Sequence, residues 1–194
     1  MFTSYNLFKP YTSSTFLRVK KPCYLVIAGH SMSGKTFLCN SLLEVYPYLF
    51  SKATQITTRP MRENEKQYEP YMFVDDRYFD LVEKDLVGVV KNPPFFYRYG
   101  TVNTIEKNKV NIIILSEEGL KDLKNKTNTK IVTIGIVNGI TRKEREKILL
   151  EEMKVLEICD KVFNNFIEDE QIKFVEPLEV VSYLLSIGVL ENAK

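Results

Sequence analysis

The chain has 194 residues, of which 44% are hydrophobic and 27% charged, and its formal net charge is +2. This balance is typical of a globular protein with one domain and a sizeable core. So small a net charge gives no global field that would favour nucleic acid or an acidic membrane as a partner, and no apolar run is long enough to predict a membrane span. Three widely spaced cysteines and a single histidine argue against a disulfide framework and a zinc site. We therefore expect a cytoplasmic protein with reduced thiols.

Apolar strands alternate with helices along the chain. A buried strand is expected over 23–29, followed by a helix from Lys35 that Pro47 ends. The further expected elements are a strand, turn, helix and strand over 71–90, a loop over 92–101, a strand over 109–119 continuing into a helix to 126, a strand over 130–139, a long helix over 141–159, a short strand over 160–165 and a helix from Pro177 to Gly188. This alternation predicts an α/β fold with a parallel sheet covered by helices on both faces.

One motif for phosphate binding follows the first strand. The sequence GHSMSGKT matches G-x-x-x-x-G-K-[ST], and its order of strand, loop and helix is the context that this motif requires. Its residues are Gly29, His30, Ser31, Met32, Ser33, Gly34, Lys35 and Thr36. The glycines let the backbone N–H groups surround a phosphate, Lys35 adds a positive charge, and Thr36 offers a hydroxyl to Mg²⁺. The motif predicts a nucleotide site, with ATP and Mg²⁺ as the expected cofactors.

A second cluster of anion-binding groups follows the motif. In TTRPMRENEKQYEPYMFV, from Thr57 to Val74, Arg59 and Arg62 are guanidinium forks suited to a phosphate dianion, and Tyr71 adds a hydroxyl donor. Glu65 is placed to brace one of the arginines by accepting its remaining donors. The alternative is a solvated charged loop with no ligand.

The cluster resembles the fingerprint of guanylate kinases, T-[ST]-R-x-x-[KR]-x-x-[DE]-x-x-G-x-x-Y-x-[FY]. The matching positions are Thr57, Thr58, Arg59, Arg62, Glu65, Tyr71 and Phe73, and the departure is Tyr68, where the family has glycine. Tyr99, Gly100 and Thr101 are similar to the family's Y-G-[ST], and the segment from Arg145 to Asn165 is similar to its R-L…D-x-V-x-[VF]-N region. The likeness covers roughly residues 23 to 185.

The resemblance implies an organisation of the chain. It implies a P-loop kinase core over 21–52 and 103–194, a small β-rich insertion over about 53–102 that binds a nucleoside monophosphate, and a short lid over about 138–145. The N-terminal arm, 1–20, lies outside the likeness, and its sequence leaves open whether it is loose or forms an edge strand.

The resemblance also implies roles for single residues. The expected substrate-binding residues are Arg59, Arg62, Glu65, Tyr71, Tyr99, Gly100 and Thr101. Lys35 and Arg145 would stabilise the transferred phosphoryl group, with Arg142 one helical turn away in support. The implied reaction is ATP-dependent phosphorylation of a nucleoside monophosphate, most simply GMP or dGMP.

Three departures concern the base and the lid. Val90 and Ser116 stand where the family has the acids that read guanine, and the family's arginine-rich lid is much shortened. A kinase for another or modified (d)NMP is therefore an open alternative, as is a catalytically weak binding module, although the intact SGKT sequence argues against the module. A P-loop switch protein is disfavoured because the chain has no N-K-x-D motif.

Overall fold

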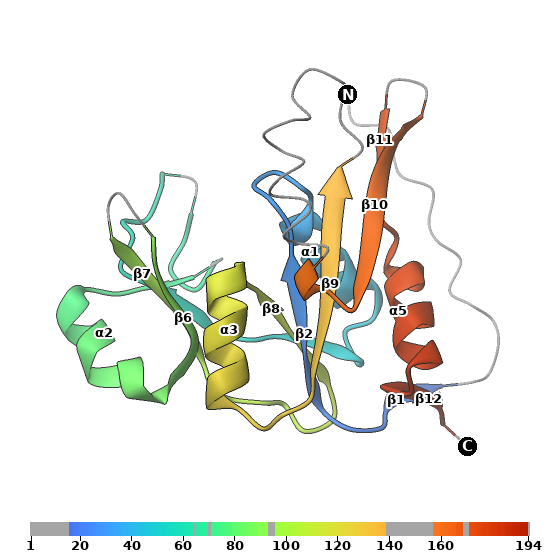
Figure 1. The fold of residues 1–194 in the computed structure, drawn as a ribbon, viewed down its shortest axis with the longest axis horizontal. Helices are drawn as coiled ribbons and strands as arrows, with labels where there is room; N and C mark the ends of the chain where they lie inside the picture. The colour runs from blue at the N-terminus through green and yellow to red at the C-terminus, as the bar shows by residue number, and fades with distance from the viewer. Residues whose placement is uncertain are drawn as a thin grey trace.

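The computed structural model describes residues 16–63, 65–69, 71–92, 96–138, 157–168 and 171–193. Its centre is a six-stranded sheet in the order β11-β10-β9-β2-β8-β3, in which all neighbours run parallel except β11 (Figure 1). The strands are β2 (Cys23–Ala28), β3 (Phe50–Lys52), β8 (Val110–Ile114), β9 (Ile131–Asn138), β10 (Lys161–Glu168) and β11 (Gln171–Lys173).

Alternating side chains of β2 divide the core between the two faces of this sheet. Leu25 and Ile27 pack in a cluster with side chains of α1 (Lys35–Val45) and α5 (Pro177–Ser186). Tyr24 and Val26 pack on the opposite face with leucines of α3 (Glu117–Lys126). The whole of β2 is buried, as expected for a strand with a helix layer on each side. The predicted parallel sheet covered on both faces is thereby confirmed.

A second sheet of four strands is inserted between β3 and β8. Its order is β5-β4-β7-β6, and its strands are β4 (Gln55–Thr57), β5 (Met72–Phe73), β6 (Leu86–Asn92) and β7 (Tyr97–Val102). One face of it carries α2 (Asp76–Val82), whose Phe79 packs with Ile56 and Leu86, and a 3₁₀ turn over Glu83–Asp85 follows α2. Figure 1 shows this small sheet and α2 on the left, separated from β2 by α3 and β8.

Several local expectations were wrong or incomplete. The loop expected over 92–101 is a strand from Tyr97, because its residues pair with both β4 and β6. The last strand extends to Glu168 and pairs with β11 instead of ending near Asn165. Within the range assigned to the N-terminal arm, β1 (Leu17–Val19) pairs antiparallel with β12 (Leu190–Asn192) and so forms a two-stranded sheet. The helix expected over 141–159 lies mostly outside the described residues.

Arg98 fixes α2 to the small sheet. Its guanidinium donates to the carboxylates of Asp76, Asp80 and Glu83 and to the Asp76 carbonyl, and it lies 4.5 Å from the centre of the Phe79 ring. The side chain is buried, whereas its carboxylate partners reach solvent. One arginine thus satisfies its donors while covering the apolar ring beneath α2.

Replacing Arg98 with methionine should lower the free energy of unfolding by about 1–3 kcal/mol, because several charge-assisted hydrogen bonds are lost while the freed carboxylates regain water. Urea unfolding followed by circular dichroism measures this. Arg77→Ala is the control, because it removes an exposed arginine of α2. It should shift the free energy of unfolding by less than about 0.5 kcal/mol. Equal effects of both changes would contradict the role given to Arg98.

Candidate functional site: two anion sites at one edge of the sheet

The phosphate-binding motif forms the expected strand, loop and helix. The loop leaves β2 at Gly29, and Gly34 caps the start of α1 with a left-handed backbone, φ 90°. A Cβ at Gly29, where φ is 149°, would lie 2.4 Å from the Ile136 carbonyl oxygen and 2.6 Å from Ser33 Oγ. Neither position therefore accepts a side chain without a shift in the loop.

The interior of the loop presents polar atoms suited to a phosphate. Ser33 is fully buried, and its hydroxyl has no hydrogen-bond partner among the described residues. Lys35 Nζ donates to the His30 carbonyl at 2.5 Å, and burial lowers the pKa of this lysine from its ordinary value. An ammonium that has lost part of its water gains strongly from a phosphate anion. The loop therefore fits the phosphates of a nucleotide.

The residues of the loop also fit a phosphate-bound Mg²⁺. Thr36 is exposed in the first turn of α1, where its hydroxyl is open to a ligand. The described residues contain no group of three or more His, Cys, Asp or Glu that could hold a metal by themselves. Mg²⁺ in phosphoryl-transfer sites is commonly held by one or two protein groups together with substrate phosphates, so a single hydroxyl is a reasonable protein contribution.

Asn165 supports the phosphate loop through hydrogen bonds, a role that the sequence motifs did not predict. Its amide donates to the Ser33 carbonyl at 2.9 Å and accepts from the Val175 N–H at 2.9 Å. The side chain is 2% exposed, so it connects β10, the phosphate loop and the segment before α5. The sequence signal was present in the D-x-V-x-[VF]-N resemblance, but its contacts span more than a hundred residues of chain.

The second anion cluster is built around an ion pair. Arg59 Nη2 donates to both Glu65 oxygens, at 2.8 and 3.0 Å, and Glu65 Oε2 also accepts from the Arg62 backbone N–H at 2.8 Å. The hydrogen bond to Arg59 is the largest cause that holds the pKa of Glu65 below its ordinary value. The expected brace is present, and it leaves Arg62 with an exposed side chain at the rim.

Aromatic rings enclose Arg59. Its guanidinium carbon lies 5.3 Å from the Phe73 ring centre and 5.9 Å from that of Tyr71. The Tyr71 and Tyr99 ring centres are 5.8 Å apart, and burial is the main cause that raises the pKa of Tyr71. The Tyr71 phenol therefore stays protonated at neutral pH and can donate to an anion. The structure thus brings Arg59, Glu65, Tyr71 and Tyr99 together.

Gly100 and Thr101 occupy opposite faces of β7. A Cβ at Gly100 would lie 2.7 Å from Leu86 Cδ1, so a side chain there would displace Leu86 from its packing beneath α2. Thr101 shares its face with Tyr99, two residues away. It is fully buried, and its hydroxyl has no partner among the described residues. Of the two, Thr101 has the polar atom that a ligand could satisfy.

Tyr68 stands where the guanylate kinase pattern has glycine, and its backbone adopts a conformation that glycine favours. Its φ is 70°, in the left-handed region, and its N–H donates to the Tyr71 carbonyl at 2.8 Å. The side chain is 65% exposed. This turn, closed by the hydrogen bond from Tyr68, leads directly to Tyr71.

Val90 and Ser116, which stand where the guanylate kinase pattern has acids, lie near each other. Val90 pairs with Tyr99, and a Cβ at Gly119 would be 3.4 Å from Val90 Cγ1. Ser116 caps α3, where its hydroxyl accepts from the Gly119 N–H at 3.3 Å. A bulge between Val87 and Val90 adds a residue to β6, but neither Gly88 nor Val89 supplies a carboxylate. An apolar side chain thus covers the first turn of α3.

Parallel pairing places the phosphate loop and the start of the small sheet at the same edge of the main sheet. Ile27 of β2 pairs with Ile114 of β8, and the phosphate loop begins two residues after Ile27. Gln55, at the start of the small sheet, donates through its side-chain amide to the Ile114 carbonyl at 3.1 Å. The carboxyl edge of a parallel sheet is where such folds bind ligands. Arg142 and Arg145 lie outside the described residues.

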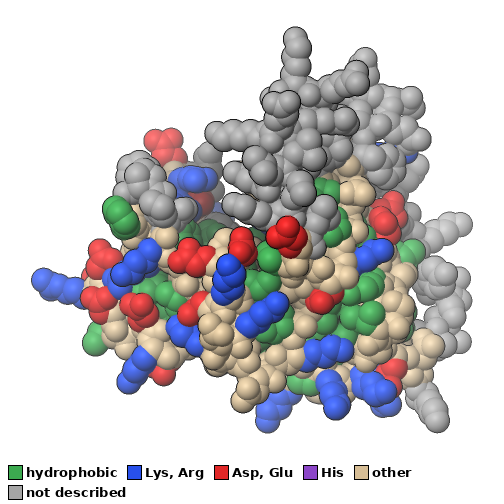
Figure 2. Space-filling model, in the orientation of Figure 1, with side chains coloured by type: hydrophobic (Ala, Val, Ile, Leu, Met, Phe, Trp, Pro, Cys, Tyr) green, Lys and Arg blue, Asp and Glu red, His purple; other side chains and the backbone are tan. Residues whose placement is uncertain are grey.

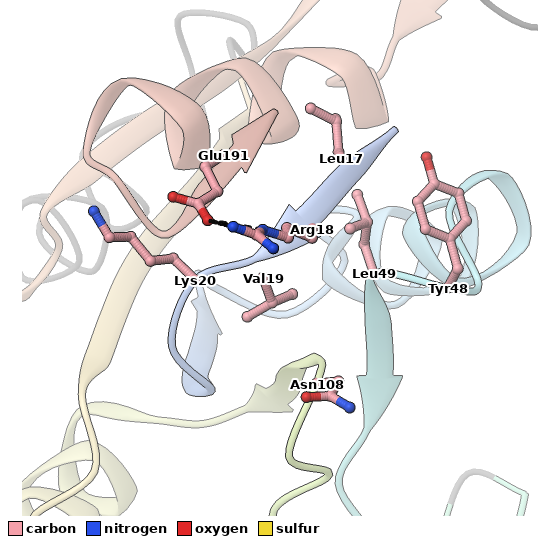
Figure 3. A pocket seen from close by; sticks show the side chains of 8 residues that line it. All are labelled: Leu17, Arg18, Val19, Lys20, Tyr48, Leu49, Asn108 and Glu191. Carbon is pink, nitrogen blue, oxygen red and sulfur yellow. Dashed lines mark hydrogen bonds and ion pairs between the residues drawn. The ribbon is translucent and has the colours of Figure 1, made fainter. Parts of the chain in front are cut away.

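A pocket of about 490 Å³ lies at the other edge of the sheet (Figure 3). It is lined by Leu17, Arg18, Val19, Lys20, Tyr48, Leu49, Asn108 and Glu191. Leu49 and Asn108 precede the first residues of β3 and β8, so this pocket opens at the amino ends of the strands. It contains none of the predicted site residues, and Arg18 is paired within it to Glu191. This pocket is therefore not part of either candidate anion site.

The surface has no strong charge of one sign on the face shown in Figure 2. Lysines and arginines concentrate along the lower edge of that view, and acidic side chains lie mostly above them. Within the described residues, no helix combines the length and apolar character needed to cross a bilayer.

Comparison with known proteins supports the fold. No protein-family model and no curated protein sequence matches the chain. Among solved structures, the guanylate kinase from Anaplasma phagocytophilum matches with a TM-score of 0.64 over 89% of each chain, at 20% sequence identity. The chain has a guanylate-kinase-like fold. At this identity the similarity extends to the arrangement of the elements and not to the activity.

Replacing Glu65 with glutamine should make stability less dependent on pH in the acid range. A carboxylate whose pKa is lowered by folding stabilises the fold above its unfolded pKa, and this contribution is lost as the pH falls through the folded value. The difference in unfolding free energy between the wild type and Glu65→Gln should therefore be constant from pH 6 to 8 and shrink below about pH 4.3. Urea titrations at each pH measure it, and a difference that grows with acid would contradict the ion pair.

At Tyr68, the left-handed backbone predicts that a glycine variant is more stable than an alanine variant, the reverse of the usual order. Because a left-handed backbone disfavours any side chain, Tyr68→Gly should be more stable than Tyr68→Ala by about 1 kcal/mol. At Glu69, which is not among the residues with positive φ, alanine should be at least as stable as glycine. Thermal melts of the four variants decide this, and an alanine variant equal to the glycine variant at position 68 would exclude the conformation.

Proposed function

We propose that the chain is a cytoplasmic nucleoside monophosphate kinase of the guanylate kinase type, which transfers the γ-phosphoryl group of ATP to a monophosphate, most simply GMP or dGMP. The single observation that supports the proposal is a second cluster of anion-binding groups, in a small sheet attached at the edge where the phosphate loop lies. The phosphate loop carries Lys35, and the second cluster consists of Arg59, Tyr71 and Tyr99. A hydrolase or switch protein needs only the phosphate loop.

In this proposal the phosphate loop holds the donor. Backbone N–H groups between Gly29 and Gly34 and the Ser33 hydroxyl bind its phosphates, and Lys35 stabilises the charge that develops on the transferred group. Thr36 would hold Mg²⁺, and the ion would supply positive charge that neutralises part of the phosphate charge. Arg145, with Arg142 in support, completes the positive field around the transferred group.

The cluster around Arg59 holds the acceptor. Arg59 is oriented by Glu65 and therefore presents a fixed fork, and Arg62 at the rim adds a second. The phenols of Tyr71 and Tyr99 donate to the same phosphate, and the buried Thr101 hydroxyl on the same face of β7 faces the remainder of the nucleotide. No general base is required, because phosphoryl transfer depends mainly on positioning and on charge stabilisation.

A kinase for another or modified (d)NMP is the second candidate, and one observation favours it. Val90 covers the turn at Gly119 with methyl groups where guanine selection would need an acceptor. The N–H donors of a buried guanine edge would be left without that acceptor, at a cost of about 1–3 kcal/mol. Selection for GMP over other monophosphates should accordingly be weak.

The test offers each (d)NMP in turn to the purified protein with ATP and Mg²⁺ and measures diphosphate formation. Lys35→Ala should lower kcat by about 10²–10³-fold, the range seen when one group that stabilises the transition state is removed. Turnover only with a monophosphate that is not GMP would establish the second candidate. A folded protein that binds ATP and phosphorylates no monophosphate would instead indicate a binding module.

Arg62→Ala separates the two sites in the same assay. Loss of a charge-assisted hydrogen bond to the acceptor should raise the KM for the monophosphate by about 10- to 150-fold and leave the KM for ATP nearly unchanged. Arg77→Ala, which removes an exposed arginine of the same small subdomain, should change neither value. Equal increases in both KM values for Arg62→Ala would contradict the assignment of this cluster to the acceptor.

A further inference from the structure

Two phenylalanine rings lie stacked on the surface beside the phosphate loop. The ring centres of Phe37 and Phe174 are 4.5 Å apart at an interplanar angle of 33°. Phe37 is 51% exposed and Phe174 38% exposed, so the pair leaves much of its aromatic surface in water. Neither residue belongs to the motifs that defined the two anion sites.

The pair is fixed in position relative to the loop. A Cβ at Gly34 would lie 3.1 Å from Phe174 Cδ1 and 3.3 Å from its Cε1, so the ring rests directly against the last glycine of the loop. Phe37 stands in the first turn of α1, which the same glycine caps. Asn165 joins the Ser33 carbonyl to the N–H of Val175, the residue after Phe174. The aromatic surface is therefore attached to the loop that would bind the phosphates.

We propose that Phe37 and Phe174 form the stacking surface for the nucleobase of the triphosphate donor. The inference rests on the proposed function, because it takes the donor phosphates to lie in the loop. A base is linked to its phosphates by one sugar and must lie close to the loop, and an exposed aromatic ring in contact with that loop offers its face at this distance. A protein partner on the same rings is the competing occupant.

Stacking also defines the substrate class. Every nucleobase has an aromatic face, so stacking alone discriminates weakly among bases. The donor site should accordingly accept purine and pyrimidine triphosphates, with affinities that follow their stacking strength. The triphosphate group supplies the common part of the affinity, and the rings supply the part that depends on having a base.

The experiment compares nucleotides with a ligand that has no base. Isothermal titration calorimetry measures the Kd of ATP, GTP, CTP, UTP and inorganic tripolyphosphate, each with Mg²⁺, for the wild type and Phe174→Ala. The substitution should weaken every nucleotide by about 5- to 150-fold and change the Kd of tripolyphosphate by less than twofold. Phe174→Tyr, which keeps the ring, should restore nucleotide binding to within about threefold of the wild type.

Tyr48→Ala is the matched control, since it removes a similarly exposed ring at the opposite edge of the sheet and should leave all five affinities unchanged. Equal weakening of ATP and tripolyphosphate by Phe174→Ala would overturn the proposal, because the ring would then support only the loop. Wild-type protein that binds tripolyphosphate as tightly as ATP would overturn it too, while leaving the phosphate site intact. Wild-type protein that binds neither ligand would reject the proposed function and this inference with it.

Discussion

The parallel pairing of β2 with β8 is the constraint on which the rest of the site depends. The strands themselves are short and apolar. Their alignment brings the phosphate loop, which follows β2, and Gln55, which attaches the small sheet to β8, to a common edge. The hydrophobic layers on both faces hold that alignment, because β2 contributes to one cluster with alternate residues and to the other with the rest. The core thus determines where the phosphate loop and the small sheet lie relative to each other.

Positive charge at this edge is arranged locally. Arg59 is paired with Glu65 and enclosed by aromatic rings, so its geometry is set before a ligand arrives. Lys35 lies against a loop carbonyl and has lost part of its hydration. Groups that are already oriented lose less freedom on binding, which is the advantage of a prearranged site. The net charge of the whole chain contributes little to this arrangement.

Local patterns predicted much of this from the sequence. The strand-loop-helix of the phosphate motif and the brace between Arg59 and Glu65 both depend on residues close in the chain, and the structure has both. The contacts of Arg98, which lies in a segment expected to be a loop, depend on how β7 pairs with two other strands. Asn165 joins segments distant in the chain, and Tyr68 adopts a conformation that its residue type disfavours. Such features depend on tertiary contacts, and no periodic pattern in the sequence predicts them.

We propose that one protein molecule binds a donor phosphate and an acceptor phosphate in line at this edge. A bisubstrate ligand in which adenosine and guanosine are joined through five phosphates tests it directly in competition experiments. If both sites are present and face each other, the ligand should bind at one per protein, displace ATP and the monophosphate together, and exceed the affinity of either by about 10²-fold or more. A ligand that binds no more tightly than ATP, or that displaces only one of the two nucleotides, would contradict the account.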